Sequence, residues 1–445
     1  AAIIGPTLKG PVNIPTLCTT YSDYQNKFGS TFISGGFEIG YFTSISAYNY
    51  FNNGGGSLLV SRVVSGNFSP ATSSTIPTSV GVTSPSLTLS FGPYRYSGSV
   101  SIQGINLFST GSNVPSNTSN TIFFFSGSSV ANTAASASQA FNASSSIGIS
   151  GSVTYSFTGG TNTEAFTLET LSEGVIMNSS GSINSSGVLD TGTSENLRWQ
   201  IQSPNTQSGT FSLLIRQGND STLSPSILET YNDLSLDPTS PNYIERIIGN
   251  TIQTIEQDGS DYYVQDNGEF PNNSRYVRVK NVHTPTPNYL DNNGIAKNSY
   301  TSSIPFQSNG VFSGAEGEIT SSSDNKYYNN ISNTNTQGVS ANDYSTPINL
   351  LSNKDSYKFN FITTPGLIDN SSYSSHVSQL TTLISNIQNR GDSMVILDTV
   401  GYGSNVSAVV TAASTRNTSY AATYYPWIMT VDPNSGRNVW VPPST

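Results

Sequence analysis

Two stretches with alternating strand and helix patterns lie at opposite ends of this chain, and their separation is the strongest constraint on its fold. Residues 1–66 predict the order strand, helix, helix, strand, a crossover that makes the two strands parallel neighbours in one sheet. Two strands alone are too few for independent stability. Strands and helices alternate again after residue 346, so we expect one discontinuous α/β core built from residues 1–66 and 347–445.

Apolar residues at regular spacing predict the elements of this core. Tyr41, Ile45 and Phe51 recur at helical spacing, and Met394–Leu397 has the continuous apolar character of a strand buried on both faces. Pro426 lies in the last predicted strand and cannot donate a ladder hydrogen bond, so we expect that strand at a sheet edge, before a turn over 432–436. The other predicted elements are strands at Ala1–Ile4, Leu58–Val64, Lys358–Thr363 and Tyr420–Val431, and helices at Tyr21–Phe28 (ended by Gly29), Val377–Ile387 (ended by Gly391) and Val406–Ala413.

The residues between the two ends predict two β-rich inserted domains, which makes the chain a multidomain protein of mixed α+β and α/β class. The first covers residues 67–193 and is rich in Ser, Thr, Gly and Asn. The second covers residues 194–346, with a short helix near Tyr243 and a polar loop. Disorder is the weaker alternative for the first, because it contains the cluster Phe123–Phe125. The predicted elements are strands at Ser86–Phe91, Ser99–Ile102, Phe211–Arg216 and Arg275–Lys280, and a helix at Val130–Ala143.

The low charge of the chain restricts its partners. Charged residues make up 10% of the sequence, against about a quarter in typical domains, and the net charge is -10 without any Lys/Arg cluster. This argues against nucleic acid or an anionic membrane as the main partner. No apolar run approaches the roughly 20 residues of a membrane span. The single cysteine, Cys18, excludes an intramolecular disulfide. The composition is typical of an assembly subunit or an extracellular β protein.

Two patterns near the last helices resemble enzyme sites but lack essential parts. Gly401-Tyr402-Gly403 follows a predicted buried strand, yet the third glycine and the lysine of a phosphate-binding loop are missing, so we interpret it as a turn with positive φ. Asp392 and Asp398 flank one strand and lie about 20 Å apart at roughly 3.3 Å per residue. They cannot form a catalytic pair, and we expect them to be solvated or to cap helices.

The remaining candidates for chemistry also lack partners. His283 and His376 have no metal ligand at a suitable spacing, and Cys18 has no base. The turns around Asp258, Asp261 and Asp266, and the turn at Asp291–Gly294, are similar to calcium loops without the bidentate Glu. We therefore predict no catalytic, cofactor or metal site and a protein that is not an enzyme.

Three blocks of residues occur in an order that a known family shares. They cover Ala2–Gly5, Lys9–Pro11, Tyr24–Gly29 and Asn53–Val63, then Gly209–Arg216, Leu236–Pro238, Asn242–Ile244 and Ile247–Gly249, and finally Thr364–Leu367, Arg390–Asp392, Ile396–Asp398 and Tyr424–Ser444. Together they resemble the tail sheath protein of contractile-tailed bacteriophages of the myovirus type. The family-motif and core positions are Gly5, Gly10, Pro11, Phe28, Gly29, Gly54, Arg62, Asp237, Pro238, Tyr243, Ile244, Gly249, Pro365, Gly366, Asp392, Asp398, Tyr425, Pro426, Trp427, Pro442 and Pro443.

The resemblance implies a structural subunit that stacks as hexameric rings around an inner tail tube and contracts to drive the tube through the host envelope for genome ejection. It further implies an α/β core beside the tube, inserted domains that project outward, and terminal arms that add strands to neighbouring subunits. The implied partners are other copies of the chain, the tail tube protein, the baseplate and the tail terminator, with no cofactor. The implied location is the virion tail sheath, assembled in the host cytoplasm.

The chain departs from the family pattern at both ends, and other functions stay open. It begins at the first core strand and stops where the family continues into its arm, so we expect both ends to be cut. The main alternative is a β-rich receptor-binding or surface-layer protein, in which residues 67–193 bind glycans or cells. A second alternative, a hydrolase that acts on the host envelope, requires a carboxylate pair that the sequence does not offer. A related bacterial contractile injection device fits the same sequence blocks as a phage tail.

Overall fold

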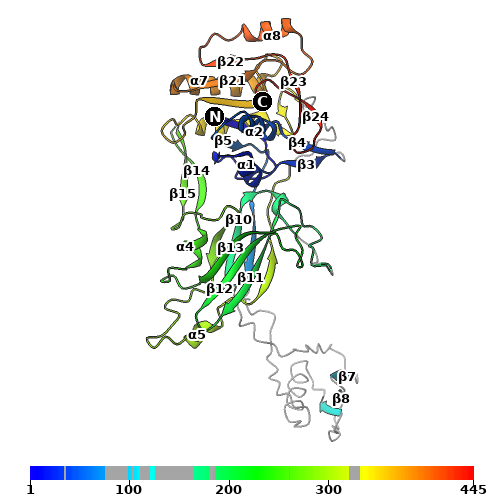
Figure 1. The fold of residues 1–445 in the computed structure, drawn as a ribbon, viewed down its shortest axis with the longest axis vertical. Coiled ribbons are helices and arrows are strands. Elements are labelled where there is room, and N and C mark those ends of the chain that lie inside the picture. Colours follow the sequence, from blue (N-terminus) through cyan, green and yellow to red (C-terminus); the bar gives the residue numbers. More distant parts are fainter. Residues whose placement is uncertain are drawn as a thin grey trace. The chain divides into compact units, whose positions relative to one another are not determined.

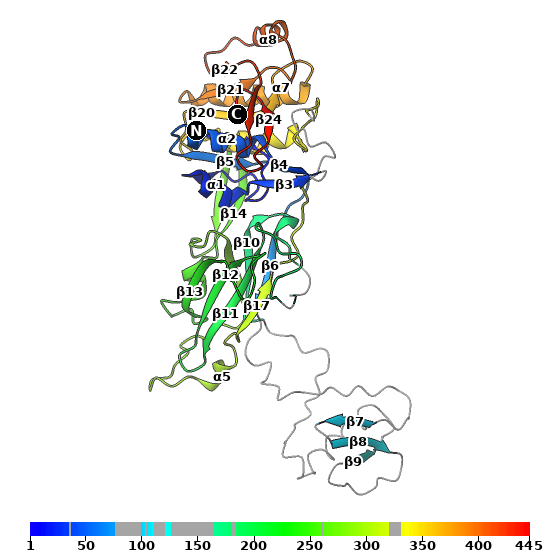
Figure 2. The same cartoon turned by 45° about the vertical axis from the view of Figure 1, so that its right-hand side comes forward.

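The computed structural model describes residues 1–34, 37–75, 99–102, 105–110, 121–125, 164–179, 184, 186–259, 261–319 and 331–445. These residues belong to two compact units, Ala1–Ser79 with Thr163–Thr445, and Val80–Asn162. The second unit contains a sheet of β7 (Ser99–Ile102), β8 (Ile105–Thr110) and β9 (Thr121–Phe125), with β7 antiparallel and β9 parallel to β8 (Figure 2). The strand predicted at Ser99–Ile102 is confirmed. The strand and helix predicted at Ser86–Phe91 and Val130–Ala143 lie outside the described residues.

In the first unit, strands from both ends of the chain form one sheet, which confirms the discontinuous α/β core (Figure 1). β1 lies between β5 and β20, with Ala2 opposite Leu59 on one side and Ile362 on the other. All neighbours are parallel except β2 and β5. In order across the sheet the strands are β2 (Thr16–Cys18), β5 (Leu58–Arg62), β1 (Ala2–Gly5), β20 (Phe361–Ile368), β21 (Met394–Asp398) and β22 (Ala421–Thr423).

Helices cover both faces of this sheet. Successive side chains along its buried strands point to opposite sides, so each strand packs against helices on both faces. Ile4 of β1 and Val395 of β21 belong to a core cluster with α6 and α7. Ile3 points the other way and packs with α1 and α2. The helices of the core are α1 (Tyr21–Phe28), α2 (Phe42–Asn52), α6 (Ser345–Leu350), α7 (Ser374–Arg390) and α8 (Val406–Ala413).

The boundaries of these helices follow capping residues. Thr20 precedes α1, and its hydroxyl oxygen accepts a hydrogen bond from Asp23 N at 3.0 Å. Gly29 follows α1 and Gly391 follows α7, both with φ of 74°, a left-handed value that a glycine adopts without steric cost. Both predicted helix ends are therefore confirmed.

The single strand predicted at Tyr420–Val431 is wrong. The chain forms the edge strand β22, leaves the sheet, and continues as a hairpin of β23 (Ile428–Val431) and β24 (Asn438–Val441). Pro426 lies between β22 and β23 after a cis peptide bond, and it has no N–H group to continue a ladder. Pro426 therefore belongs to no edge strand, although β22, which precedes it, is the edge of the core sheet. The predicted turn over 432–436 is confirmed.

A middle β domain occupies the centre of the chain. Its three-stranded sheet contains β6 (Pro70–Thr75), β10 (Phe166–Glu173) and β16 (Val277–Val282), and its four-stranded sheet contains β13 (Ile227–Ser235), β12 (Thr210–Gln217), β11 (Leu197–Asn205) and β17 (Ser308–Val311). Phe166 stacks on Phe211 across the two sheets, at a ring distance of 5.6 Å. β6 and β10, from the first predicted insertion, pair with β16 of the second. The two sheets therefore share one hydrophobic core.

Smaller elements complete the first unit. The strand predicted at Phe211–Arg216 and the helix near Tyr243 are confirmed, and the strand predicted at Arg275–Lys280 begins two residues later as β16. The strand predicted at Lys358–Thr363 instead spans Phe361–Ile368. Every helix in the described part of the chain is too short or too polar to cross a membrane. The remaining elements are β3 (Thr31–Ser34), β4 (Phe37–Gly40), η1 (Val175–Met177), α4 (Ile244–Ile248), β14 (Ile252–Asp258), β15 (Asp261–Asn267), α5 (Asn298–Thr301), β18 (Asn335–Thr336), β19 (Val339–Ser340) and η3 (Ala341–Tyr344).

Candidate functional site

The ionisable residues considered for chemistry do not converge on one place. Among the described residues, no three His, Cys, Asp or Glu side chains lie close enough together to hold a metal ion. His376 is buried, and its Nδ1 accepts a hydrogen bond from Ile368 N at 3.0 Å. Burial lowers the pKa of His376 to about 4, so the ring is neutral at pH 7. His283 lies elsewhere, where its ring contacts Thr167 and Glu164.

The aspartates of the calcium-like turns lie in two separate turns and have different partners. Asp266 accepts a hydrogen bond from the Gln253 side chain at 2.9 Å. Asp291 Oδ1 accepts hydrogen bonds from Asn293 N at 2.8 Å and Ile295 N at 2.9 Å. Asp258 and Asp261 are paired residues at the turn of the β14–β15 hairpin. Gly403 has a φ of 81°, which confirms the interpretation of Gly401–Gly403 as a turn.

A cleft of about 530 Å³ lies between α2 and the end of the chain. Its lining includes Ile3, Tyr50, Phe361, Ile396 and Ser444 and no acidic or basic side chain. The cleft therefore offers a largely apolar surface next to the two end residues Ala1 and Thr445.

Asp398 is buried at the carboxyl end of β21, so the expectation that it is solvated is wrong. Asp398 is 2% exposed. Its carboxylate accepts hydrogen bonds from Ser444 N at 3.1 Å, Ser444 Oγ at 2.6 Å and Gly366 N at 3.5 Å. Burial raises the pKa of Asp398 to about 7. Asp392, at the other end of β21, is exposed and pairs with Arg390 at 3.0 Å. Asp398 thus ties the end of the chain to the core sheet.

Pro365 and Gly366 bring β20 against the β18–β19 turn. The Gly366 carbonyl accepts a hydrogen bond from Thr336 Oγ1 at 2.8 Å, and the Pro365 carbonyl accepts one from Gln337 Nε2 at 3.0 Å. Gly366 has a φ of 93°, and a Cβ atom there would lie 2.7 Å from Thr336 Oγ1. Only glycine fits this close approach.

Trp427 packs the β23–β24 hairpin against the core. Its Nε1 donates a hydrogen bond to the Val400 carbonyl at 2.9 Å, and its ring meets Phe42 edge-on at 5.9 Å. The Tyr425 hydroxyl donates to the Ser404 carbonyl at 3.2 Å. Of the two prolines that follow the hairpin, Pro442 is buried and Pro443 is partly buried. The third block of family-motif residues therefore surrounds the end of the chain.

The first block gathers around the loop that follows β1. Arg62, at the end of β5, donates a hydrogen bond to the Gly10 carbonyl at 2.7 Å, and the Phe28 carbonyl accepts one from Lys9 N at 3.1 Å. Gly10 has a φ of 112°, and a Cβ atom there would lie 2.7 Å from the Phe28 ring. Pro11 continues the same loop. Gly5 lies against α2, whereas Gly54 follows α2 with open space around it.

The second block forms turns of the middle β domain. Asp237 Oδ1 accepts a hydrogen bond from Thr239 N at 2.9 Å, across the turn that contains Pro238. Tyr243 and Ile244 begin α4, and Gly249 ends it with a φ of 107°. The structure therefore brings the family-motif residues to three separate places, and their role in assembly stays a prediction.

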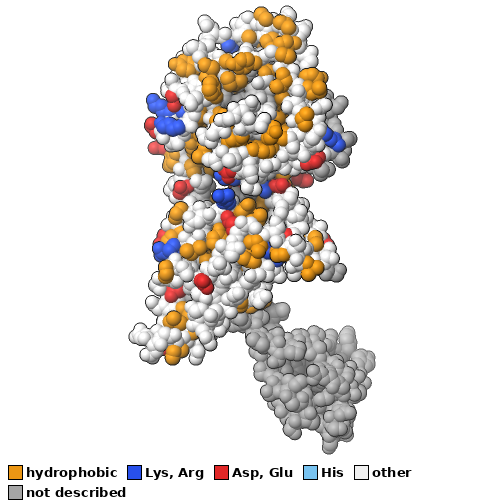
Figure 3. Space-filling view, viewed as in Figure 1, with side chains coloured by type: hydrophobic (Ala, Val, Ile, Leu, Met, Phe, Trp, Pro, Cys, Tyr) orange, Lys and Arg blue, Asp and Glu red, His pale blue; other side chains and the backbone are white. Residues whose placement is uncertain are grey.

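An exposed apolar surface lies where α8 meets the β23–β24 hairpin. Val406 and Val410 of α8 are 60% and 59% exposed, and only Ala412 of this helix is buried. Figure 3 shows hydrophobic side chains gathered over this part of the molecule, with few charged side chains among them. We call it the α8–hairpin surface, and its exposed members are Tyr402, Val406, Val410, Tyr424, Tyr425, Ile428, Met429 and Val431.

One aromatic contact links the loop before α8 to the hairpin. Tyr402, in the loop before α8, packs on Trp440 of the hairpin at a ring distance of 5.2 Å. From Thr399 to Val431 the sequence contains one charged residue, Arg416, and its guanidinium pairs with Asp369 at 2.7 Å. Exposed apolar side chains gathered in one part of a molecule, with few charges among them, are typical of interaction sites.

Sequence reasoning predicted α8 but missed its exposure, although the sequence carries a signal for it. The helix reads VSAVVTAA and has no charged residue on any side. A helix that is apolar nearly all round is normally buried in a core or against a partner. α8 is short and leads to an edge strand. Of burial in the chain's own core and packing against a partner, these features favour the second.

Comparisons with known proteins find similarity only among solved structures, and it is distant. No protein-family model and no curated protein matches the chain. Among solved structures it is similar to the crystal structure of a sheath tail protein from Listeria innocua, with a TM-score of 0.34 and 9% sequence identity. The match covers 89% of this chain and 47% of that one, so the chain spans about half the length of its neighbour. A similarity this distant does not place the chain in a family.

Proposed function

We propose that this protein is a structural subunit of a contractile phage tail sheath, which stacks as hexameric rings around the tail tube and contracts to drive it through the host envelope. The observation that carries the proposal is the α8–hairpin surface, which leaves eight large apolar or aromatic side chains exposed on an otherwise well-packed α/β core. The three ordered sequence blocks and the discontinuous core with inserted domains also support it.

Self-association gives the exposed side chains a physical reason. Full burial of a Val, Ile or Met side chain stabilises by roughly 1.5–3 kcal/mol, so covering one that is half exposed contributes about 1 kcal/mol. Several such residues in one continuous surface favour a permanent contact. A surface without charge also creates no repulsion between identical subunits.

The edge of the core sheet offers a second mode of contact. β22 pairs with β21 on one side, and no other described strand pairs with its outer side. Free N–H and C=O groups on an edge strand can accept a strand from another chain. In the proposed assembly a terminal arm of a neighbouring copy adds such a strand, while the core moves largely as a rigid body during contraction.

The proposed partners follow from this role. They are other copies of the chain, the tail tube protein, the baseplate and the tail terminator, and the proposed location is the virion tail. The role requires no catalytic group and no cofactor. Genome ejection would follow from movement of the tube.

Immunogold electron microscopy of the source particle tests the proposal. Antibodies raised against the purified chain should decorate the whole tail shaft, in both the extended and the contracted state, and the shaft should show sixfold striation. Decoration confined to the tail tip would favour the receptor-binding alternative. Decoration of the cell surface without any tail would favour a surface-layer protein.

A further inference from the structure

Arg62 lies at the joint between the α/β core and the middle β domain. It is the last residue of β5, is 0% exposed, and its guanidinium lies over the Phe68 ring at 5.1 Å. Nη1 donates hydrogen bonds to the Gly10 carbonyl at 2.7 Å and to the Glu173 carbonyl at 2.9 Å, and Nη2 donates to the Leu8 carbonyl at 3.4 Å. One nitrogen therefore bridges a loop of the core and the last residue of β10 in the middle domain.

Further contacts close the same joint. The Gly10 carbonyl also accepts a hydrogen bond from Glu173 N at 3.4 Å, so both domains converge on one oxygen. The buried ammonium of Lys9 pairs with the Glu195 carboxylate at 2.8 Å, just before β11 of the middle domain. These contacts involve two neighbouring residues of one core loop and two different segments of the middle domain.

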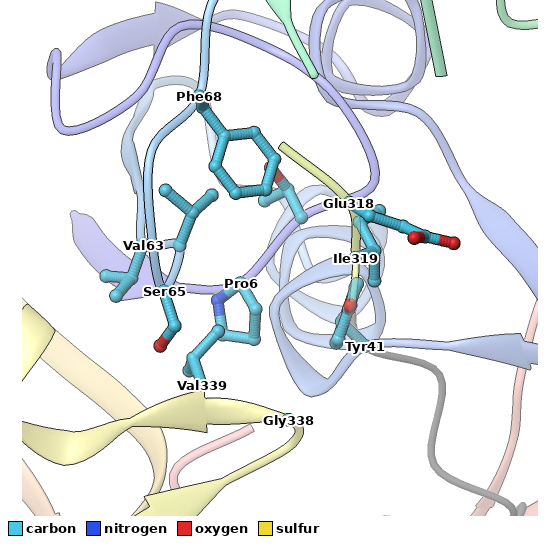
Figure 4. Close-up of a pocket in the computed structure, with 11 residues that line it drawn as sticks. Pro6, Tyr41, Val63, Ser65, Phe68, Glu318, Ile319, Gly338 and Val339 are labelled. Carbon is cyan, nitrogen blue, oxygen red and sulfur yellow. The ribbon is translucent and has the colours of Figure 1, made fainter. Parts of the chain in front are cut away.

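The joint is tightly packed. Phe68 points toward Val63 and Pro6 at a small cavity (Figure 4). The cavity has a volume of about 10 Å³, enough for at most one water molecule. No ion pair to Arg62 occurs among the described residues, so main-chain carbonyls, the Phe68 ring and the nearby charge of Glu173 compensate its burial.

We propose that Arg62 is a coupling residue that makes the α/β core and the middle β domain open and move as one body. In the closed joint, one planar guanidinium satisfies carbonyls from both domains. Without it, the Gly10 and Glu173 carbonyls lose a buried donor, and only opening of the joint would give them water. A lysine ammonium keeps the charge but lacks the planar fork that reaches several acceptors in fixed directions. The proposal does not depend on the function of the protein.

Hydrogen exchange of the full chain under increasing urea tests this coupling. In the unchanged protein, the slowest amides of β12 in the middle domain and of β21 in the core should exchange through the same opening, with the same urea dependence. Arg62→Met should separate them, with at least tenfold faster exchange in one domain relative to the other. Arg216→Met is the matched control, because Arg216 is equally buried but lies within the middle domain, paired with Asp220 at 2.7 Å. This control should accelerate exchange in both domains together.

Each outcome decides the proposal. Separation in Arg62→Met but not in Arg216→Met supports it. Parallel acceleration of both domains in Arg62→Met, or different opening of the two domains in the unchanged protein, overturns it. If Arg62→Met does not fold, Arg62→Lys takes its place: separated exchange supports the coupling role, and parallel exchange overturns it.

Discussion

α7 and α8 precede and follow the same strand, β21, yet they meet opposite environments. Both contain apolar residues at helical spacing. In α7, Leu380, Leu383 and Ile387 are at most 1% exposed and pack on the core sheet, whereas the α8 residues Val406 and Val410 are about 60% exposed. α7 has a polar outer face, so its apolar residues are covered within its own chain. α8 exposes Val406 and Val410 beside the polar residues Ser407 and Thr411, so part of its apolar surface is left uncovered by the described residues.

The largest expected effect concerns the buried helix. Leu380→Ala should lower the free energy of unfolding by about 2–5 kcal/mol, because it leaves a cavity in a packed core. Val410→Ala in α8 should cost less than about 1 kcal/mol, since most of that side chain already contacts solvent. Urea unfolding followed by circular dichroism measures both values. Equal losses of unfolding free energy in the two variants would contradict the difference in burial between α7 and α8.

The strand between the two helices should make stability depend on pH. Burial raises the folded-state pKa of Asp398 from 3.8 to about 7, so the folded protein binds its proton more tightly than the unfolded chain does. The resulting stabilisation is complete below about pH 4 and is lost as the pH rises through 7, by up to about 4 kcal/mol. Unfolding free energies measured between pH 4 and pH 8 give the slope.

Asp398→Asn is the control for this dependence. The amide should remove the loss of stability with rising pH, while it keeps an oxygen that can accept from Ser444. The opposite dependence of buried His376, whose pKa is lowered to about 4, should then remain as a rise in stability between about pH 4 and pH 6.5. Asp392→Asn, at the exposed end of the same strand, should leave the slope in place. An unchanged slope in Asp398→Asn would assign the pH dependence to other groups.

A smaller effect is expected where the hairpin meets the core beside α8. Trp427→Phe keeps an aromatic ring against Phe42 but removes the donor to the Val400 carbonyl. Leaving that buried carbonyl without its partner should cost about 1–3 kcal/mol. Trp440→Phe is the comparison, because Trp440 is only partly buried. Thermal unfolding should rank the two, and a larger loss in Trp440→Phe would mean that the hairpin is held from its outer side.

The smallest effect on stability should accompany the clearest effect on association. The double variant Val406→Ser with Val410→Ser should change the free energy of unfolding by about 0.5 kcal/mol or less, because both sites are exposed. It should nevertheless weaken self-association, which sedimentation velocity over a range of concentrations measures. Leu223→Ser, at a position 89% exposed in the middle domain, should leave association unchanged. Equal association in the double variant and the unchanged chain would rule out α8 as a subunit contact.

Sequence patterns predicted the elements of the core better than their surroundings. The spacing of Leu380, Ile384 and Ile387 fixes a helix and its buried face, because periodicity records which residues share a side. The stripe of α8 has the same period, and the two helices differ in a feature that periodicity does not capture, the absence of charged residues from α8. The three-residue strand β2 was missed because so short a segment has no measurable periodicity.

The contacts between distant segments could not be predicted from the sequence for a different reason. Asp398 contacts Ser444, 46 residues later, and Arg62 contacts Glu173, 111 residues later. One sequence gives no sign of such distant pairs. The resemblance marked Arg62 and Asp398 as positions of interest, and burial then showed that both are charged groups enclosed by hydrogen-bond partners from distant segments.

The pairing of β1 with β20 also determines when the core can form during synthesis. Ala2 lies opposite Ile362, so 360 residues separate the two strands. At about 5–20 residues per second, a ribosome needs roughly 20–70 s to make the second strand after the first. Over that time the edge of β1 that later pairs with β20 stays open, while the middle domain, which lies between β5 and β20 in sequence, can already fold. The core sheet is therefore completed only after the middle domain has been made, and until then the open edge of β1 is exposed to wrong pairing on a crowded polysome.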